Sequence, residues 1–241
     1  MNNLVRIVLV AASLVVAKRP IPENMGETDL PDGSKAGIWV PKARAKVPLV
    51  VWFHGGIGAN DHAKGVPAAR NMAALWRDSA AFAMVAPSAW PASPWWSDEA
   101  VARTRVAIQL ASMRKGVDAS RVILAGASDG GTGALWIAAK LRPELGKRLK
   151  AVAVWSCNPD VLSMQGLALP AVPLEGLPVR WTAGGRDRLY PLSRIQEYWA
   201  VLGQAGWKLE THADPVADHD LSFHAADLAK FPAWTRKTTK P

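Results

Sequence analysis

The stretch Gly126-Ala127-Ser128-Asp129-Gly130-Gly131 joins an apolar run at 121–126 (RVILAG) to a segment with helical spacing at 129–141. It has the form G-x-S-x-G between a predicted strand and a predicted helix, which is typical of a very tight turn. The turn strains the serine backbone, and side chains at either glycine would collide. It projects the hydroxyl at the end of the sheet, beside a helix N-terminus that favours negative charge. Ser128 is therefore the candidate nucleophile.

The rest of the chain alternates short β-rich runs with helical patterns, which indicates βαβ units and a mostly parallel sheet with helices on both faces. The expected strands are residues 37–41, 48–54, 82–86, 121–126, 150–156, 178–183 and 207–213. The expected helices are 66–78, 98–115, 129–141, 192–205 and a closing helix within 223–236, broken or bent near Pro232. Residues 158–177 have no clear period and are too short for a cap domain. The fold class expected is α/β without a large cap, and with a fairly open site.

A histidine downstream of Ser128 is the next requirement. A serine hydroxyl is a poor nucleophile until a base takes its proton, and after such an elbow the acid and the histidine follow in chain order. His212 lies inside a predicted strand, whereas His219 lies in the polar loop DPVADHD after that strand. From that loop a side chain can reach back over the sheet edge. We predict His219 as the base, while His224, at the start of the closing helix, stays an alternative.

The acidic partner of the histidine is expected in a loop after a late strand. Asp187 fits this place in the segment WTAGGRDRLYP, where two glycines turn the chain out of the strand and Pro191 opens the next helix. Its carboxylate would orient the histidine and stabilise the imidazolium. Asp160, after the preceding strand, is the second candidate.

Backbone donors for a developing oxyanion are expected from His54-Gly55-Gly56-Ile57-Gly58, at the end of the predicted strand 48–54. Glycines let the backbone approach a reacting carbonyl closely. One donor would be the N–H of Gly56 or Ile57, and the other the N–H of Asp129. His54 precedes the serine and is therefore expected to be structural.

Three tryptophans stand out from the 12 in the chain because Trp90, Trp95 and Trp96 lie on the loop after the strand 82–86. In such a sheet this loop borders the carboxyl-end site. The three rings are predicted either to form an aromatic wall for substrate or to plug the loop onto the core.

At this point the chain resembles α/β-hydrolase esterases, especially the phospholipase/carboxylesterase and polyhydroxybutyrate-depolymerase-like groups, which include feruloyl esterases. The resemblance covers about residues 30–235 and rests on PLVVWFHGG, MVAPSAW with PWWSD, GASDGG, GGRDRLYP and the final histidine loop. It implies hydrolysis of carboxylic esters through an acyl-enzyme, without a cofactor or metal. A serine peptidase of the same fold and a non-catalytic binding protein are the alternatives. The sequence departs from these groups at Asp129, where relatives often carry Gln, Asn or Met, and at Asp218, where they often carry Gly.

Composition and the N-terminal sequence indicate the binding partners and the cellular location to expect. The chain has 241 residues, 49% of them hydrophobic, and a formal net charge of +9 whose basic residues are dispersed. Without a nucleic-acid motif this charge predicts a solvated basic surface, not nucleic-acid binding. Residues 1–17, with Arg6 before the apolar run 7–17, indicate a signal peptide and a secreted or periplasmic protein, with one catalytic domain at 18–241. The single cysteine, Cys157, is expected to be a buried filler.

Overall fold

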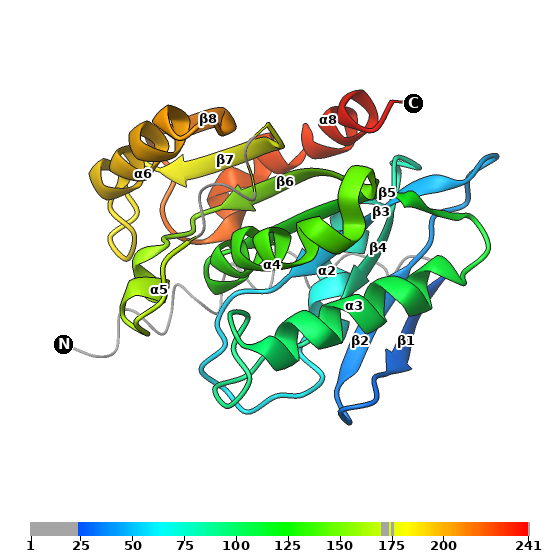
Figure 1. Cartoon of the computed structure of the whole chain (residues 1–241). Coiled ribbons are helices and arrows are strands. Elements are labelled where there is room, and N and C mark those ends of the chain that lie inside the picture. The colour runs from blue at the N-terminus through cyan, green and yellow to red at the C-terminus, as the bar shows by residue number, and fades with distance from the viewer. Residues whose placement is uncertain (1–23, 170–173, 175, 241) are drawn as a thin grey trace.

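A computed structural model describes residues 24–169, 174 and 176–240. Its centre is an eight-stranded sheet with the order β1-β2-β4-β3-β5-β6-β7-β8 (Figure 1). The strands are β1 Met25–Asp29, β2 Lys35–Trp39, β3 Val47–Phe53, β4 Ala83–Ala86, β5 Val117–Ala127, β6 Leu149–Trp155, β7 Pro178–Gly184 and β8 Lys208–Asp214. β2 runs antiparallel to β1 and β4, and every pairing from β4 through β3 to β8 is parallel. The carboxyl ends of the parallel strands therefore meet at one edge of the sheet.

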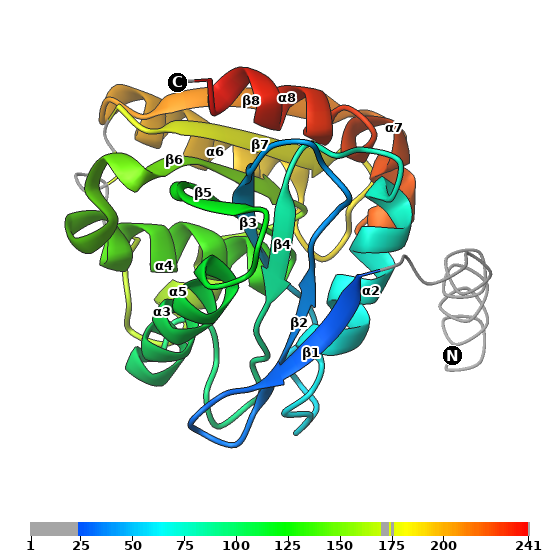
Figure 2. The ribbon, with the colours of Figure 1, turned by 90° about the vertical axis from the view of Figure 1, so that its right-hand side faces the viewer.

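The helices cover both faces of this sheet, as the sequence predicts. They are α2 Gly65–Trp76, α3 Asp98–Ser112, α4 Asp129–Leu145, α5 Asp160–Ser163, α6 Leu192–Gln204, α7 Ala225–Leu228 and α8 Phe231–Thr238. Figure 2 shows α3 and α4 on one side of the sheet and α2 on the other. α3 begins with a full cap, because the Ser97 side chain accepts a hydrogen bond from Ala100 N and two acidic residues occupy the first turn.

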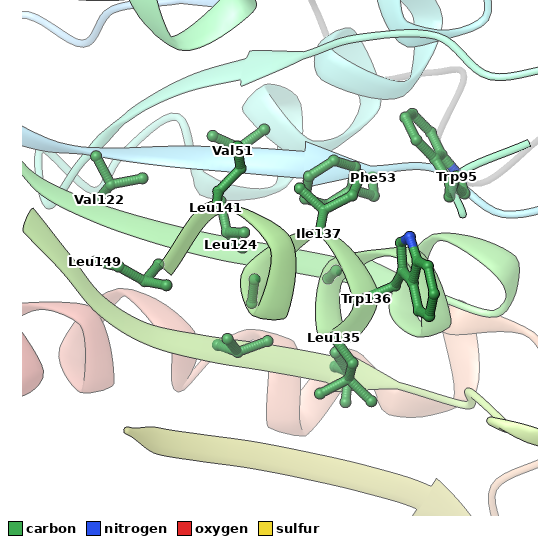
Figure 3. Packing of buried hydrophobic residues seen from close by; sticks show 14 of the residues in the cluster. Val51, Phe53, Trp95, Val122, Leu124, Leu135, Trp136, Ile137, Leu141 and Leu149 are labelled. Carbon is green, nitrogen blue, oxygen red and sulfur yellow. The ribbon is translucent and has the colours of Figure 1, made fainter. Parts of the chain in front are cut away.

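Two cores result from the alternation of side chains along the buried strands. In β3 the side chains of Leu49, Val51 and Phe53 pack toward α3 and α4, as Figure 3 shows for Val51 and Phe53. Those of Val50 and Trp52 pack with α2 and α8 on the opposite face. All of β3 is buried, which is why the strand reads as a continuous apolar run. Each fully buried aliphatic side chain contributes about 1.5–3 kcal/mol.

Two elements differ from the sequence-based expectation. β1 was not expected, because its sequence MGETD is polar and mostly exposed and carries no alternating pattern. The closing helix is two short helices, α7 and α8, preceded by a 3₁₀ turn at Leu221–His224. The break falls at 229–230, and Pro232 lies in the first turn of α8. There its missing N–H costs no helical hydrogen bond, so it starts a helix rather than bending one.

Between β6 and β7 the described residues include the short helix α5 and a turn that closes with Leu167 N donating to Leu162 O. Within the described part of residues 158–177 there is no cap domain over the sheet edge. No helix among the described residues is long and apolar enough to cross a membrane. Residues 1–17, the predicted signal peptide, lie outside the described residues.

Candidate active site

Ser128 stands on a strained turn between β5 and α4. Its φ of 54° and ψ of −128° lie in a region that non-glycine residues rarely occupy, at a cost of about 1–3 kcal/mol. The two glycines of the motif explain how the turn closes. A Cβ on Gly126 would lie 2.4 Å from Gly130 O, and one on Gly130 would lie 2.1 Å from Phe53 O. Both contacts are impossible, so glycine is required at both positions.

The structure brings Ser128, His219 and Asp187 together at the carboxyl ends of β5, β8 and β7. Ser128 Oγ lies 2.9 Å from His219 Nε2, and His219 Nδ1 lies 2.8 Å from Asp187 Oδ2. The second carboxylate oxygen of Asp187 accepts the backbone N–H groups of Leu189 and Tyr190, each at 2.9 Å. Asp187 is buried, and these hydrogen bonds fix its carboxylate toward the imidazole.

The loop of His219 is itself anchored to the loop of Asp187. Arg186 N donates to Ala217 O at 2.9 Å, and Gly185 N donates to Asp214 O at 2.7 Å. A Cβ on Gly184 would lie 2.5 Å from Ala217 O, so the two loops approach as closely as only glycine allows. The backbone thus sets the distance between the acid and the histidine before their side chains meet.

The other candidate histidines lie elsewhere. His212 is exposed on β8, at the edge of the sheet. His224 is 1% exposed, and its Nε2 lies 2.8 Å from Ser156 Oγ. Burial lowers the pKa of His224, so it is held neutral in the interior. Neither is hydrogen-bonded to Ser128.

Asp160, the second candidate for the acid, is bound to Arg194 and Tyr198 of α6. Its carboxylate lies 2.7 Å from an Arg194 guanidinium nitrogen and accepts the Tyr198 hydroxyl at 2.6 Å. The hydrogen bond from Arg194 is the main reason that the pKa of Asp160 is lowered. Asp160 therefore ties α5 to α6 and does not reach His219.

The loop after β3 lies directly against the nucleophile turn. A Cβ on Gly55 would lie 2.9 Å from Ser128 Cβ, so only glycine permits this approach. Gly56 adopts a φ of +66°, and the Lys64 ammonium donates to its carbonyl oxygen. The Ile57 N–H donates to Asp129 Oδ2 at 3.1 Å. Of the two candidate oxyanion donors in this loop, the N–H groups of Gly56 and Ile57, that of Ile57 is therefore already hydrogen-bonded to Asp129.

His54 is structural, as expected from its place before the serine. Its Nε2 accepts the Ala89 N–H at 3.1 Å and its Nδ1 lies 3.0 Å from Gly55 O, so the tautomer with the proton on Nδ1 satisfies both contacts. Burial lowers its pKa to about 4. A neutral His54 therefore holds the loop after β4 against the loop after β3.

The three tryptophans do not form a common aromatic wall. Trp95 has no exposed surface. Its ring packs against Phe53, as Figure 3 shows, and its Nε1 donates to His54 O at 2.9 Å. Trp90 is 7% exposed, because its ring stacks on His62 at 4.0 Å and lies 4.1 Å from the Arg103 guanidinium carbon. Both rings hold the loop against the protein, so of the two expected roles their contacts agree with packing and not with an aromatic wall for substrate.

Trp96 is partly exposed and packs against the same core, so a role for it in substrate contact stays a prediction. Cys157 is fully buried, and burial raises the pKa of its thiol well above the usual value, as befits a core filler. Among the residues that the structure describes, no group of three or more His, Cys, Asp or Glu side chains could hold a metal ion.

Sequence reasoning missed one residue of this site, Tyr190. Its ring meets the His219 ring edge-on at 4.9 Å, and its phenol interacts with the Ser128 side chain. Burial, with a further contribution from the nearby Asp129 carboxylate, raises the pKa of Tyr190 to about 12. The only sequence signal was its position three residues after Asp187, in the loop that also carries the acid.

We compared the chain with known proteins. No known family model and no curated protein matches the chain, whereas many solved structures share its fold. An esterase from Pyrobaculum calidifontis superposes with a TM-score of 0.69 at 19% identity, covering 97% of this chain and 92% of the esterase. The thermostable carboxylesterase EstE1 from a metagenomic library gives 0.69 at 21% identity, covering 98% and 96%. Esterase B from Lactobacillus rhamnosis gives 0.70 at 16% identity, covering 96% and 93%.

The chain has the α/β-hydrolase fold. The strand order, the antiparallel β2 and the strained serine between β5 and α4 agree with this assignment. Identities of this size carry the fold and leave the reaction to be argued from the site.

Proposed function

We propose that the protein is a serine hydrolase that cleaves carboxylic esters through an acyl-enzyme. The observation that carries the proposal is the continuous chain of hydrogen bonds from Ser128 Oγ through the His219 ring to Asp187. Esterases are prominent among the solved structures that share the fold, which supports the same reaction class. We further propose, from the sequence resemblance, that the protein is related to the phospholipase/carboxylesterase and polyhydroxybutyrate-depolymerase-like groups of esterases.

In the proposed reaction Ser128 Oγ attacks the ester carbonyl carbon while His219 Nε2 takes the hydroxyl proton. Asp187 stabilises the imidazolium that forms. His219 then gives the proton to the alcohol oxygen as the carbon–oxygen bond breaks, which leaves an acyl group on Ser128. A water molecule, activated by the same histidine, hydrolyses this acyl-enzyme and releases the acid.

The oxyanion formed in each step requires backbone donors beside Ser128. The Asp129 N–H is the first of α4, where N–H groups lack an intrahelical acceptor. Because the Ile57 N–H already donates to the Asp129 carboxylate, we assign the second donor to Gly56. Two such donors contribute several kcal/mol, since losing one commonly costs about 10²–10³ in rate.

An ester and amide comparison tests this reaction class. We expect turnover of p-nitrophenyl acetate or butyrate, and little or no turnover of matched p-nitroanilides, because the structure holds no cap or second domain in its described part to position a peptide. A fluorophosphonate probe should label Ser128, read by peptide mass. Faster cleavage of the anilides would favour a peptidase, and absence of both labelling and turnover would favour a non-catalytic protein.

We further propose that the protein is exported, on the basis of the apolar run 7–17 behind Arg6. Protein isolated from an extracytoplasmic fraction of its native cell should then start near Lys18, as read by N-terminal sequencing. An intact Met1 on a soluble cytoplasmic protein would contradict this.

A further inference from the structure

The carboxylate of Asp129 sits beside the candidate nucleophile without a cationic partner. It follows Ser128 directly in the chain and is half-buried. One oxygen, Oδ2, accepts the Ile57 N–H. The ion pairs found among the described residues include none with Asp129. The N-terminus of α4 and the Ile57 N–H favour its negative charge, but no protein cation in the described part of the chain is paired with it.

Two neighbouring carboxylates at this end of the sheet have charged or ionisable partners, because Asp187 is paired with His219 and Asp160 with Arg194. Asp218 resembles Asp129 in accepting a backbone N–H, that of His219 at 2.7 Å. The Lys64 ammonium, which lies against the adjacent loop, donates to the Gly56 carbonyl oxygen. Asp129 is therefore the carboxylate that is bound to the loop after β3 and has no ion pair among the described residues.

Such a charge works against ester hydrolysis of a neutral substrate. The transition state places a negative oxygen between the backbone N–H groups of Asp129 and the loop after β3. In a partly buried site a nearby carboxylate repels that oxygen more strongly than it would in water. A cation on the substrate would remove this penalty and gain an ion pair at the same time.

Tyr190 completes the surroundings of such a cation. Its ring meets the ring of the candidate base His219 edge-on at 4.9 Å, which places it beside the nucleophile. Burial, with a further contribution from the Asp129 carboxylate, raises the pKa of its phenol to about 12, so the phenol is neutral. The site thus offers a carboxylate and a neutral phenol beside one serine, and both groups can accept a hydrogen bond from an ammonium group.

We propose that the site takes esters whose acyl part carries a protonated amine within a few bonds of the scissile carbonyl, and that Asp129 binds this amine. The inference rests on the proposed ester hydrolysis. The acyl side is assigned because the alcohol oxygen must face His219 to receive its proton, whereas Asp129 is bound to the oxyanion loop through Ile57. α-Amino acid esters are the simplest members of this class.

Two substrates of nearly equal shape test the proposal. Alanine benzyl ester carries an ammonium group at the position where benzyl isobutyrate carries a methyl group. At a pH below the amine pKa, which is about 7.7–8 for an α-amino group and lower in an ester, the wild-type kcat/KM should favour the alanine ester by about tenfold or more. Asp129→Asn should lower that ratio by about tenfold or more, because the alanine ester loses the ion pair in addition to any loss that the two esters share.

Asp78→Asn is the matched control, because it removes the same charge from an exposed side chain outside the site. It should leave the ratio unchanged. A wild-type ratio near one, with Ser128 labelled by a fluorophosphonate and both esters cleaved, would overturn the substrate class and leave the esterase proposal standing. Absence of turnover and of labelling would overturn both. The wild-type ratio, divided by the ratio of the uncatalysed hydrolysis rates because an α-ammonium group itself activates the carbonyl, decides even if Asp129→Asn fails to fold, which its circular dichroism would report.

Discussion

Ser128→Ala is expected to lower kcat for ester hydrolysis by about 10⁴-fold or more, with little change in the free energy of unfolding. The hydroxyl is the atom that bonds to the substrate, and nothing else near the turn can replace it. Cys157, the single thiol, is fully buried with a raised pKa. Alanine occupies the same backbone as serine, so the strained turn is kept at a similar cost. Steady-state kinetics with p-nitrophenyl butyrate and thermal unfolding measure the two effects.

Ser156→Ala is the matched control for this variant. Ser156 also has a positive φ, of 43°, also ends a parallel strand and also bonds a histidine, His224 at 2.8 Å. Because that pair is buried, we expect its loss to lower stability by about 1–3 kcal/mol and to leave kcat within about tenfold of wild type. Near wild-type activity in Ser128→Ala, or a larger catalytic loss in Ser156→Ala, would contradict the assignment of the nucleophile.

The α/β architecture was predictable because buried parallel strands leave a plain signal. β3 and the later parts of β5 and β6 are apolar runs followed by polar residues, and α3 begins with a recognisable serine cap. The positions of Ser128, Asp187 and His219 could be named for a related reason. In a parallel sheet, residues that directly follow strands share one edge, so chain order alone places them near one another.

Side-chain direction was not predictable in the same way. Nothing in the sequence indicates that Trp95 turns into the core to donate to His54 O, or that Asp129 reaches across to the Ile57 N–H. Both contacts join segments far apart in the chain and depend on where two loops meet. Tyr190 was missed because its contact with His219 arises from the same meeting of loops. β1 was missed because an exposed edge strand needs no apolar pattern.

His219→Ala is expected to reduce turnover to nearly the level of Ser128→Ala. Without the imidazole, the Ser128 hydroxyl keeps its proton and the leaving alcohol receives none. The double variant Ser128→Ala/His219→Ala should be little worse than either single variant, because the two residues act as one unit and their losses do not add. Single-turnover kinetics on one activated ester, with all three proteins at equal concentration, provide the comparison.

His224→Ala distinguishes His219 from His224, the alternative base that the sequence left open. Its side chain bonds Ser156 in the interior and is not hydrogen-bonded to Ser128, so its loss should cost less than about tenfold in kcat, or about 1.4 kcal/mol of barrier. The same change should lower the free energy of unfolding by about 2 kcal/mol, since it leaves a cavity and an unpaired buried hydroxyl. His219 is partly exposed at the sheet edge, and its removal should cost less stability than activity. If His224→Ala abolished turnover in a folded protein while His219→Ala retained it, the base would be His224.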